Sequence, residues 1–557
     1  MNKFKKPCKN LLFLIMMPLI LGGFSCSKEN EYIYILENNE FSNLKISKEE
    51  TKGKVFKPSE VNLIYTINEL SKNKDSYASG KYIEATKEVK PKMLVIPVHF
   101  NDKDNIEFSN DYSLSKLRNR IDDAFNADSS VNGYYGVKEF YQKSSYGLVD
   151  FDFLIPSFYK TKMESKEIDT SYKTNQLIKK ILNDDEYLKA NDINLKDFDT
   201  NNDGFIDSIF LIYDIPDYQT SNKTNTNLWA YTQSSYNVGN LDKPVYSSYS
   251  WASYSFLDKG LTENIKNDTH IFIHEIGHQF GLNDYYDYNL KSSPLSGFDM
   301  MDYNVIDFNS YSKMIMGWIK PYIVYGEATI NEEELRKSNS PVVILKDNKV
   351  ITKDLNDNVL FNPFNEYLVL DYFDYSINSL NYFDMTNGYS YKGFNKDVLI
   401  QKSGYRIFHV DNRMLKINNN VASFYDKDEK ISSNKDKLYR FINNTNKGNN
   451  KRYESFLISD NKIKFDYDGD IDSLNELTWI AKVTENQNNY SSLYIKEVKE
   501  NNEIIEKLFT PSENYLFNSG DTFDPINYSN YFLNSKKENK IVLDNNETFS
   551  TKIDFNY

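Results

Sequence analysis

The sequence predicts a mixed α/β domain followed by β-rich domains. Strand-like apolar runs alternate with helix-like segments over residues 89–325, and this alternation is typical of α/β folds. After Pro321 helical patterns become rare, and short strand-like runs lie between turns rich in Asn, Asp and Lys. The 557 residues allow three to four domains at roughly 150 residues each. We therefore expect an α/β domain at 89–325, a β-rich domain packed on it at 326–450, and another β-rich domain at 451–557.

The elements of the α/β domain follow from hydrophobic periodicity. Residues 93–98 form a continuous apolar run with the length of a buried strand, and residues 114–125 repeat apolar side chains at helical spacing. Further elements of this domain are expected at 137–142 (helix), 148–155 (strand), 175–188 (helix) and 208–213 (strand).

The β-rich half is expected to be β-sandwich-like, because its apolar runs are short and turn signals separate them. Its strands are predicted at 341–345, 367–370, 405–410, 478–483 and 492–498.

Composition and charge exclude several classes of protein. Asp and Glu number 80 against 66 Lys and Arg, so the net charge is −14 and no basic stripe offers a nucleic-acid surface. The mean hydropathy of −0.63 excludes a protein with many membrane spans. With 21 Gly and 2 Cys the chain is neither collagen-like nor a disulfide scaffold.

The N-terminus has the features of an export signal. Four lysines precede residues 11–21, an apolar stretch too short to span a bilayer. Small residues then lead to Cys26, which resembles the lipidated cysteine of a bacterial lipoprotein; plain secretion is the alternative. We expect a signal at 1–26 and an exported protein, either secreted or anchored to the membrane through Cys26. The polar residues 27–88 are predicted to be a tether or a prosegment.

One segment, residues 268–284, contains the candidate metal ligands and the candidate catalytic base. Asp268 or Thr269 can cap a helix on which His274 and His278 are four residues apart, so both imidazoles project from one face and suit a single zinc ion. Glu275 is rotated by about 100° from His274, beside the metal, where it could accept a proton from a water molecule that zinc activates.

Two residues after this helix complete the predicted metal site. Gly281 fits the left-handed position that ends a helix, and the resulting turn brings Asp284 back as a third ligand. The alternative is that these residues coincide on an ordinary amphipathic helix. With only 5 His in the chain, such a coincidence is rare.

The other histidines have simpler expected roles. His270 is eight residues from His278, about 12 Å along a helix axis, and therefore too far away to share one metal ion with it. His99 and His409 lie in strand-like runs, where a buried histidine with satisfied hydrogen bonds is expected.

The segment His274-Glu275-x-x-His278-x-x-Gly281-Leu282-x-Asp284-x-Tyr286-Asp287 resembles the metzincin-type motif of the immune inhibitor A family of bacterial metallopeptidases. Residues 297–303 are similar to the Met-turn of that family, and weaker similarity extends over roughly 90–430. The resemblance implies a zincin/metzincin-like fold for 89–325, with Asp284 as a zinc ligand and Met301 packed beneath the metal. It also implies a place for Tyr303 near the metal or the oxyanion.

A second segment offers oxygen ligands for calcium. Residues 199–207 resemble the first part of an EF-hand loop, but Phe210 stands where the closing Glu would be. Either a shortened calcium loop or a solvated acidic turn is consistent with this pattern, and residues 466–472 are a weaker version of it. The candidate calcium ligands are Asp199, Asn201, Asp203 and Asp207.

These features together predict an exported zinc endopeptidase that hydrolyses extracellular proteins. Glu275 would be the general base, and residues 27–88 could confer latency. The alternative is a surface adhesin that retains a zinc-peptidase scaffold, although an intact Glu275 argues against it. A zinc hydrolase of non-peptide bonds is also compatible with the motif.

Overall fold

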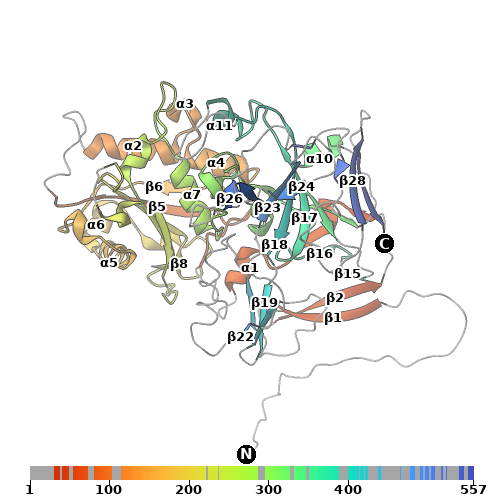
Figure 1. Ribbon diagram of the computed structural model, residues 1–557. Helices are drawn as coiled ribbons and strands as arrows, with labels where there is room; N and C mark the ends of the chain where they lie inside the picture. Colours follow the sequence, from red (N-terminus) through yellow and green to blue (C-terminus); the bar gives the residue numbers. More distant parts are fainter. Residues whose placement is uncertain are drawn as a thin grey trace, which may run out of the picture.

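A computed structural model of the chain is drawn in Figure 1. No helix among the residues that it describes is both long and apolar enough to cross a bilayer. The predicted signal with Cys26 lies outside these residues. The structure describes residues 30–37, 40–48, 54–72, 81–102, 114–220, 224–286 (except 236), 295, 297–325, 332–345, 350–387 (except 355) and 399–412. Between residues 413 and 556 it describes only short strands and residues 516–517.

The protein is of the mixed α/β class, as the sequence predicts. The central sheet of the α/β half runs β10-β12-β9-β5-β6, with β7 also paired to β5. Its strands are parallel except β10, which pairs antiparallel with β12 and forms one edge. The strands span β5 (Lys92–His99), β6 (Asp152–Leu154), β7 (Tyr159–Lys160), β9 (Ser208–Tyr213), β10 (Tyr231–Ser234) and β12 (Ser248–Ser253).

Helices cover both faces of this sheet (Figure 1). Successive side chains of β5 point to opposite faces: Met93 and Val95 join one buried cluster, and Leu94 and Ile96 join another. The first cluster includes residues of α2 (Leu114–Asn126), α4 (Val137–Ser144) and α7 (His270–Gln279); the second includes residues of α5 (Ser171–Ile181) and α6 (Asp185–Ala190).

Two elements of this half differ from the prediction. The single helix expected at 175–188 is two helices, α5 and α6, because Asp184 caps a new helix by accepting a hydrogen bond from Tyr187 N. The strand expected at 148–155 is only three residues long in β6.

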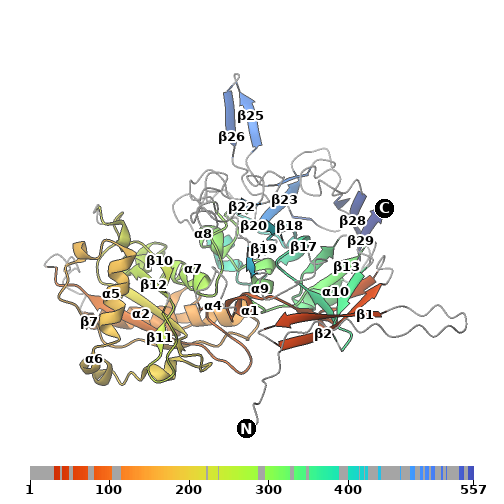
Figure 2. The same cartoon turned by 90° about the horizontal axis from the view of Figure 1, so that it is seen from below.

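The β-rich half contains a seven-stranded sheet in the order β24-β23-β18-β17-β14-β13-β3. Figures 1 and 2 show this half beside the α/β half, with α7 near the middle of the molecule. The strands predicted near 342, 368, 407 and 480 are all present. The sheet comprises β3 (Lys54–Phe56), β13 (Tyr322–Tyr325), β14 (Val342–Leu345), β17 (Glu366–Phe373), β18 (Gly404–Asp411), β23 (Leu477–Lys482) and β24 (Tyr490–Ser492).

The segment 27–88 is not a free tether over its described part. Within the β-rich half β3 pairs with β13, β4 (Val61–Leu63) pairs with β16 (Val359–Phe361), and Val61 and Ile67 are buried. Short apolar groups within a polar sequence therefore supply strands to downstream sheets. The hairpin of β1 (Asn30–Glu37) and β2 (Glu40–Lys48), visible in Figure 2, pairs with β15 (Val350–Lys353).

Several short elements complete the described structure. A four-stranded sheet runs β21-β19-β20-β22, and the last strands form a hairpin and a three-stranded sheet. The short helices are α1 (Ile67–Lys72), α3 (Ser129–Asn132), α8 (Met300–Tyr303), α9 (Ser310–Ile315), α10 (Glu332–Ser338) and α11 (Tyr382–Asn387). The remaining strands are β8 (Phe205–Ile206), β11 (Val245–Tyr246), β19 (Met414–Asn418), β20 (Val421–Phe424), β21 (Lys437–Arg440), β22 (Lys464–Phe465), β25 (Lys496–Glu500), β26 (Glu503–Lys507), β27 (Thr522–Phe523), β28 (Glu538–Asp544) and β29 (Ser550–Asn556).

Candidate metal centre

The helix α7 is buried along almost its whole length and packs on the central sheet. It begins at His270, with Thr269 at the N-cap position. Thr269 makes no capping hydrogen bond; Asp268 Oδ1 instead accepts from His270 N at 3.1 Å. On this helix the rings of His274 and His278 lie with their centroids 4.7 Å apart. The spacing that the sequence predicts thus places both imidazoles on one face.

Asp284 meets these two histidines. Its Oδ1 atom lies 3.0 Å from His274 Nε2 and 3.2 Å from His278 Nε2. Ligand atoms from the three residues lie within 4.8 Å of one another, and no other group of three His, Cys, Asp or Glu residues in the described part of the chain does so. The structure therefore brings together the three residues that the sequence predicts as metal ligands.

Backbone carbonyls fix the protonation of both rings. His274 Nδ1 lies 2.8 Å from Met300 O, and His278 Nδ1 lies 2.8 Å from Leu282 O. A carbonyl oxygen only accepts hydrogen bonds, so each Nδ1 must carry a proton and donate it. Each Nε2 is then free to offer a lone pair toward Asp284. This arrangement is how proteins orient histidines that bind metals.

The donor set fits a metal ion. Asp284 Oδ1 is buried and makes no hydrogen bond within the described structure, since its close approaches to the two Nε2 atoms lack hydrogen-bond geometry. The distances of 3.0 and 3.2 Å are close to the separation of about 3.3 Å between neighbouring donors of a tetrahedral ion with bonds of about 2.0 Å. An ion shared by the three donors would satisfy the buried oxygen.

Electrostatics favour positive charge at the same point. Burial raises the pKa of Asp284, but the charge of His278 and the closeness of both imidazoles prevail and hold it well below its usual range. Burial lowers the pKa of His278, but the carboxylate of Asp284 prevails and raises it to about 9. The buried carboxylate thus favours a positive charge beside it, which a proton on His278 or a metal ion could supply.

Gly281 ends α7 and turns the chain toward Asp284. Its φ is +89°, the left-handed conformation that favours glycine. A Cβ atom at this position would lie 2.6 Å from Ile67 Cγ2, so the helix end is also in close contact with the N-terminal segment. Both the backbone conformation and this packing require glycine here.

Met301 lies directly against α7. A Cβ atom on Gly277 would be 2.5 Å from the Met301 sulfur, so the methionine packs against the helix at Gly277. The preceding carbonyl, Met300 O, holds His274. Tyr303 is half-buried two residues further on, and its role near the metal remains a prediction.

Glu275 projects from the same helix toward the edge strand β10. It is 4% exposed, and its Oε2 atom accepts a hydrogen bond of 2.7 Å from Thr232 Oγ1. Burial raises the pKa of Glu275 above its usual range, although His278, His274 and the Thr232 hydroxyl all oppose that shift. A buried carboxylate beside a metal site is suited to accept a proton.

Three polar residues around Glu275 are missing from the sequence prediction: Thr232, Ser250 and Gln279. Thr232 and Ser250 stand opposite each other in the β10–β12 pairing, and Gln279 lies one helical turn after Glu275. No local motif marks the two hydroxyls. Only the position of Gln279, four residues after Glu275, could have indicated a shared helix face.

The remaining histidines lie apart from the metal site. His409 is buried, with Nε2 3.2 Å from Glu366 Oε1, and His270 is buried between two carboxylates. His99 is bonded to Asp214, but its side chain is 29% exposed, more than expected.

The predicted calcium ligands lie together in one loop that flanks β8. Asp199 accepts hydrogen bonds from the backbone N–H groups of Asp203 (2.9 Å) and Gly204 (3.0 Å). Asn201 Oδ1 also accepts from Asp203 N, at 3.3 Å. Asp207 accepts from Thr200 N at 3.1 Å, and burial raises its pKa to about 6.

Within the described loop these acidic groups do not converge on a common point as the metal-site residues do. Their carboxylates instead bind backbone amides, and Asp203 Oδ2 lies 3.6 Å from Lys81 Nζ. Calcium binding by this loop stays a prediction, and residues 466–472 lie outside the described structure.

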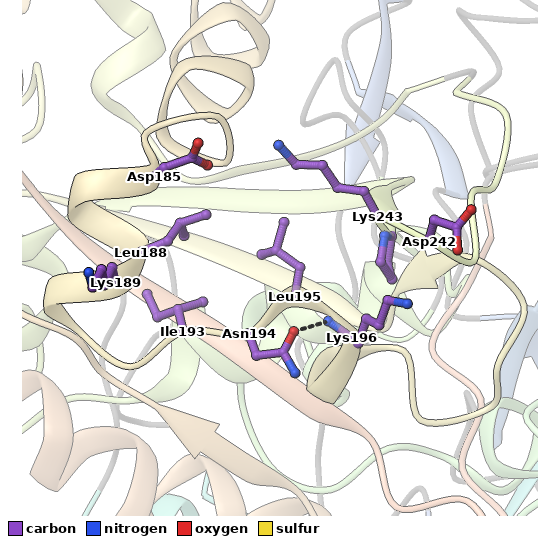
Figure 3. Close-up of a pocket in the computed structure, with 10 residues that line it drawn as sticks. Asp185, Leu188, Lys189, Ile193, Asn194, Leu195, Lys196, Asp242 and Lys243 are labelled. Carbon is purple, nitrogen blue, oxygen red and sulfur yellow. Dashed lines mark hydrogen bonds between the residues drawn. The ribbon is translucent and has the colours of Figure 1, made fainter.

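A cavity of about 300 Å³ lies away from this centre, between α6, the loop that follows it and residues 242–244 (Figure 3). Lysines and aspartates surround an apolar floor there, but none of the lining residues belongs to the metal centre. The lining residues include Asp185, Lys189, Lys196, Asp242 and Lys243.

Comparison with known proteins adds no relative: no protein-family model and no curated protein matches the chain.

Proposed function

We propose that the protein is an exported zinc endopeptidase. The observation that carries this proposal is the position of Glu275, a buried carboxylate next to His274 on the helix that supplies two donors of the metal centre. Two imidazoles and one carboxylate accept zinc and also ferrous iron. A general base beside these donors favours hydrolysis as the reaction. Hydrolysis in turn favours zinc over iron as the metal.

When bound, zinc lowers the pKa of water to about 7 and polarises a carbonyl group. His274, His278 and Asp284 would hold it. Glu275 has one oxygen, Oε2, bonded to Thr232. Its other oxygen, Oε1, would take a proton from the attacking water and then pass that proton to the leaving amine.

The edge strand β10 supports a peptide as the substrate. It has one pairing partner, β12, among the described strands, and Tyr231, Gln233 and Ser234 are exposed. Thr232 of this strand contacts Glu275, so an extended peptide added to the free edge would pass beside the base. A small ester or amide would not need such an edge.

Further features of the proposal rest on the sequence. The resemblance to the immune inhibitor A family supports a metzincin-like fold for the α/β half and a β-sandwich-like fold for the rest. The N-terminal signal supports export, with lipidation of Cys26 as the proposed anchor.

The test compares the purified protein with Glu275→Gln, which keeps the side-chain shape and removes the base. Casein cleavage and metal content are measured in both proteins, with Glu263→Gln, an exposed acid, as the matched control. We expect about one zinc per chain in all three, and a loss of cleavage by about 10²- to 10⁴-fold only in Glu275→Gln. Iron in place of zinc, or equal cleavage by Glu275→Gln, would contradict the proposal. A protein that binds zinc without cleaving would favour the adhesin alternative.

A further inference from the structure

A chain of buried hydrogen bonds ends at the carboxylate of Glu275. Gln279 Nε2 lies 2.7 Å from Ser250 Oγ, Ser250 Oγ lies 2.7 Å from Thr232 Oγ1, and Thr232 Oγ1 lies 2.7 Å from Glu275 Oε2. Gln279 and Ser250 are fully buried, and Thr232 is half-buried. Burial requires that these polar groups satisfy one another rather than water.

The orientation of Gln279 sets the start of the chain. Its Nε2 lies 3.2 Å from Ile209 O, which can only accept, and its Oε1 accepts from Ser208 Oγ at 2.5 Å. The amide therefore has its N–H groups directed at Ile209 O and Ser250 Oγ. Since Ser250 Oγ accepts from Gln279, its own proton is available for the hydroxyl of Thr232.

The acceptors within reach of Ser250 and Thr232 set the direction of the last hydrogen bond, from Thr232 to Glu275. Ser250 has a second acceptor within reach, Glu275 O, but at 3.4 Å it is more distant than Thr232 Oγ1 at 2.7 Å. Thr232 Oγ1 then accepts from Ser250 and has one proton to donate. An ionised carboxylate is a stronger acceptor than the Glu275 carbonyl, which lies 2.9 Å away, so the proton points to Oε2.

We propose that Thr232 is a positioning residue for Glu275: its hydroxyl, oriented by Ser250 and Gln279, holds Oε2 and leaves Oε1 directed at the reacting water. The sheet register provides this arrangement, because Thr232 and Ser250 are paired across β10 and β12. Glu275 and Gln279 face them from one side of α7, four residues apart. This inference rests on the proposed peptidase function.

The experiment compares Thr232→Val, which replaces the hydroxyl by a methyl group, with Thr232→Ser, which retains it. The substrate is a quenched fluorescent peptide taken from a casein cleavage site, and kcat and KM are measured separately. A hydrogen bond to a charged group is worth enough to change kcat by about tenfold or more. We expect kcat to fall by about tenfold or more in Thr232→Val while KM stays unchanged. In Thr232→Ser we expect kcat to stay within about threefold of the parent value.

Zinc content and thermal stability accompany the kinetics, and Thr232→Ala serves as the second variant without the hydroxyl. Parental kcat in the folded, zinc-loaded Val and Ala variants would overturn the inference. An equal loss in Thr232→Ser would also overturn it, since the hydroxyl would then not be the cause. Crystal structures of the parent and Thr232→Val give a readout that is independent of activity: the Glu275 carboxylate should turn only in the variant. If the parent does not cleave, the proposed function fails, and the crystal structures still test the position of Glu275.

Discussion

Asp384 Oδ1 lies 2.9 Å from His270 Nε2, and this contact joins α11 of the β-rich half to the first turn of α7. Asp268 Oδ1 lies 2.7 Å from the other ring nitrogen, and the ring stacks on Tyr134 with centroids 3.9 Å apart. Asp384 Oδ2 also accepts a hydrogen bond of 2.6 Å from Ile306 N, five residues after Met301. One carboxylate from the β-rich half thus contacts both the start of α7 and the segment that follows Met301.

The charge of His270 should make stability depend on pH. Burial lowers the pKa of this imidazole, but Asp384 and Asp268 prevail and raise it to about 9, above its ordinary value of 6.5. Tyr134 is the other titratable group packed on the ring. The native state therefore binds a proton that the unfolded state releases. The resulting stabilisation is complete below pH 6.5 and is lost as the pH rises through about 9.

Urea unfolding measured from pH 6 to pH 10 checks this dependence. The parent should lose at most about 1.4 kcal/mol of unfolding free energy per pH unit through this one group. His270→Gln should be less stable at pH 6 and should lack that part of the slope. A variant with the same slope as the parent would show that His270 does not carry the charge.

Replacing Asp384 by Asn should destabilise the protein by about 3 kcal/mol, because a buried charge then loses one partner. The loss of charge should weaken the contact with His270 even though the side-chain shape is retained. The same unfolding measurement on Asp242→Asn, an exposed aspartate, is the matched control and should show almost no change. Equal stability of Asp384→Asn and the parent would rule out a bracing role for this carboxylate.

Gly277 and Met301 should be energetically coupled. A Cβ atom at Gly277 would lie 2.5 Å from the Met301 sulfur. Gly277→Ala should therefore cost about 1–3 kcal/mol through overpacking, and Met301→Ala about 2–5 kcal/mol through a cavity. The double variant should cost less than the sum, because the new methyl group enters the space that the methionine leaves. Strict additivity in the unfolding free energies would mean that the two side chains do not compete for one space.

The candidate metal ligands lie close together in the sequence, and they could be predicted because helix geometry determines their relative positions. The four-residue spacing of His274 and His278, the glycine at 281 and the return of Asp284 all depend on contacts within eleven residues of chain. Continuous apolar runs likewise predict β5 and β9, whose side chains fill clusters on both faces of the sheet.

The partners of these residues could not be predicted in the same way. Thr232 is 43 residues from Glu275, and Asp384 is 114 residues from His270. They meet because of sheet register and the packing of the two halves, which no local pattern encodes. The N-terminal strands β3 and β4 could not be predicted for a related reason. Each is only three residues long and pairs with a strand that is distant in the sequence.

Removal of the metal should destabilise the protein through the buried carboxylate of Asp284. A ligand that binds only the native state adds about 2.7 kcal/mol at a concentration of 100 times its Kd, and a chelator removes that contribution. The melting temperature of the parent should therefore fall on treatment with EDTA and recover with added zinc. In Asp284→Asn the donor set loses its charge, so EDTA should have little effect on the melting temperature of that variant.

Asp242→Asn is the matched control and should respond as the parent does, because its carboxylate is exposed and lines the pocket away from the metal centre. A parent that melts at the same temperature with and without EDTA, after metal analysis confirms that the ion is gone, would mean that the three residues hold their positions without a metal.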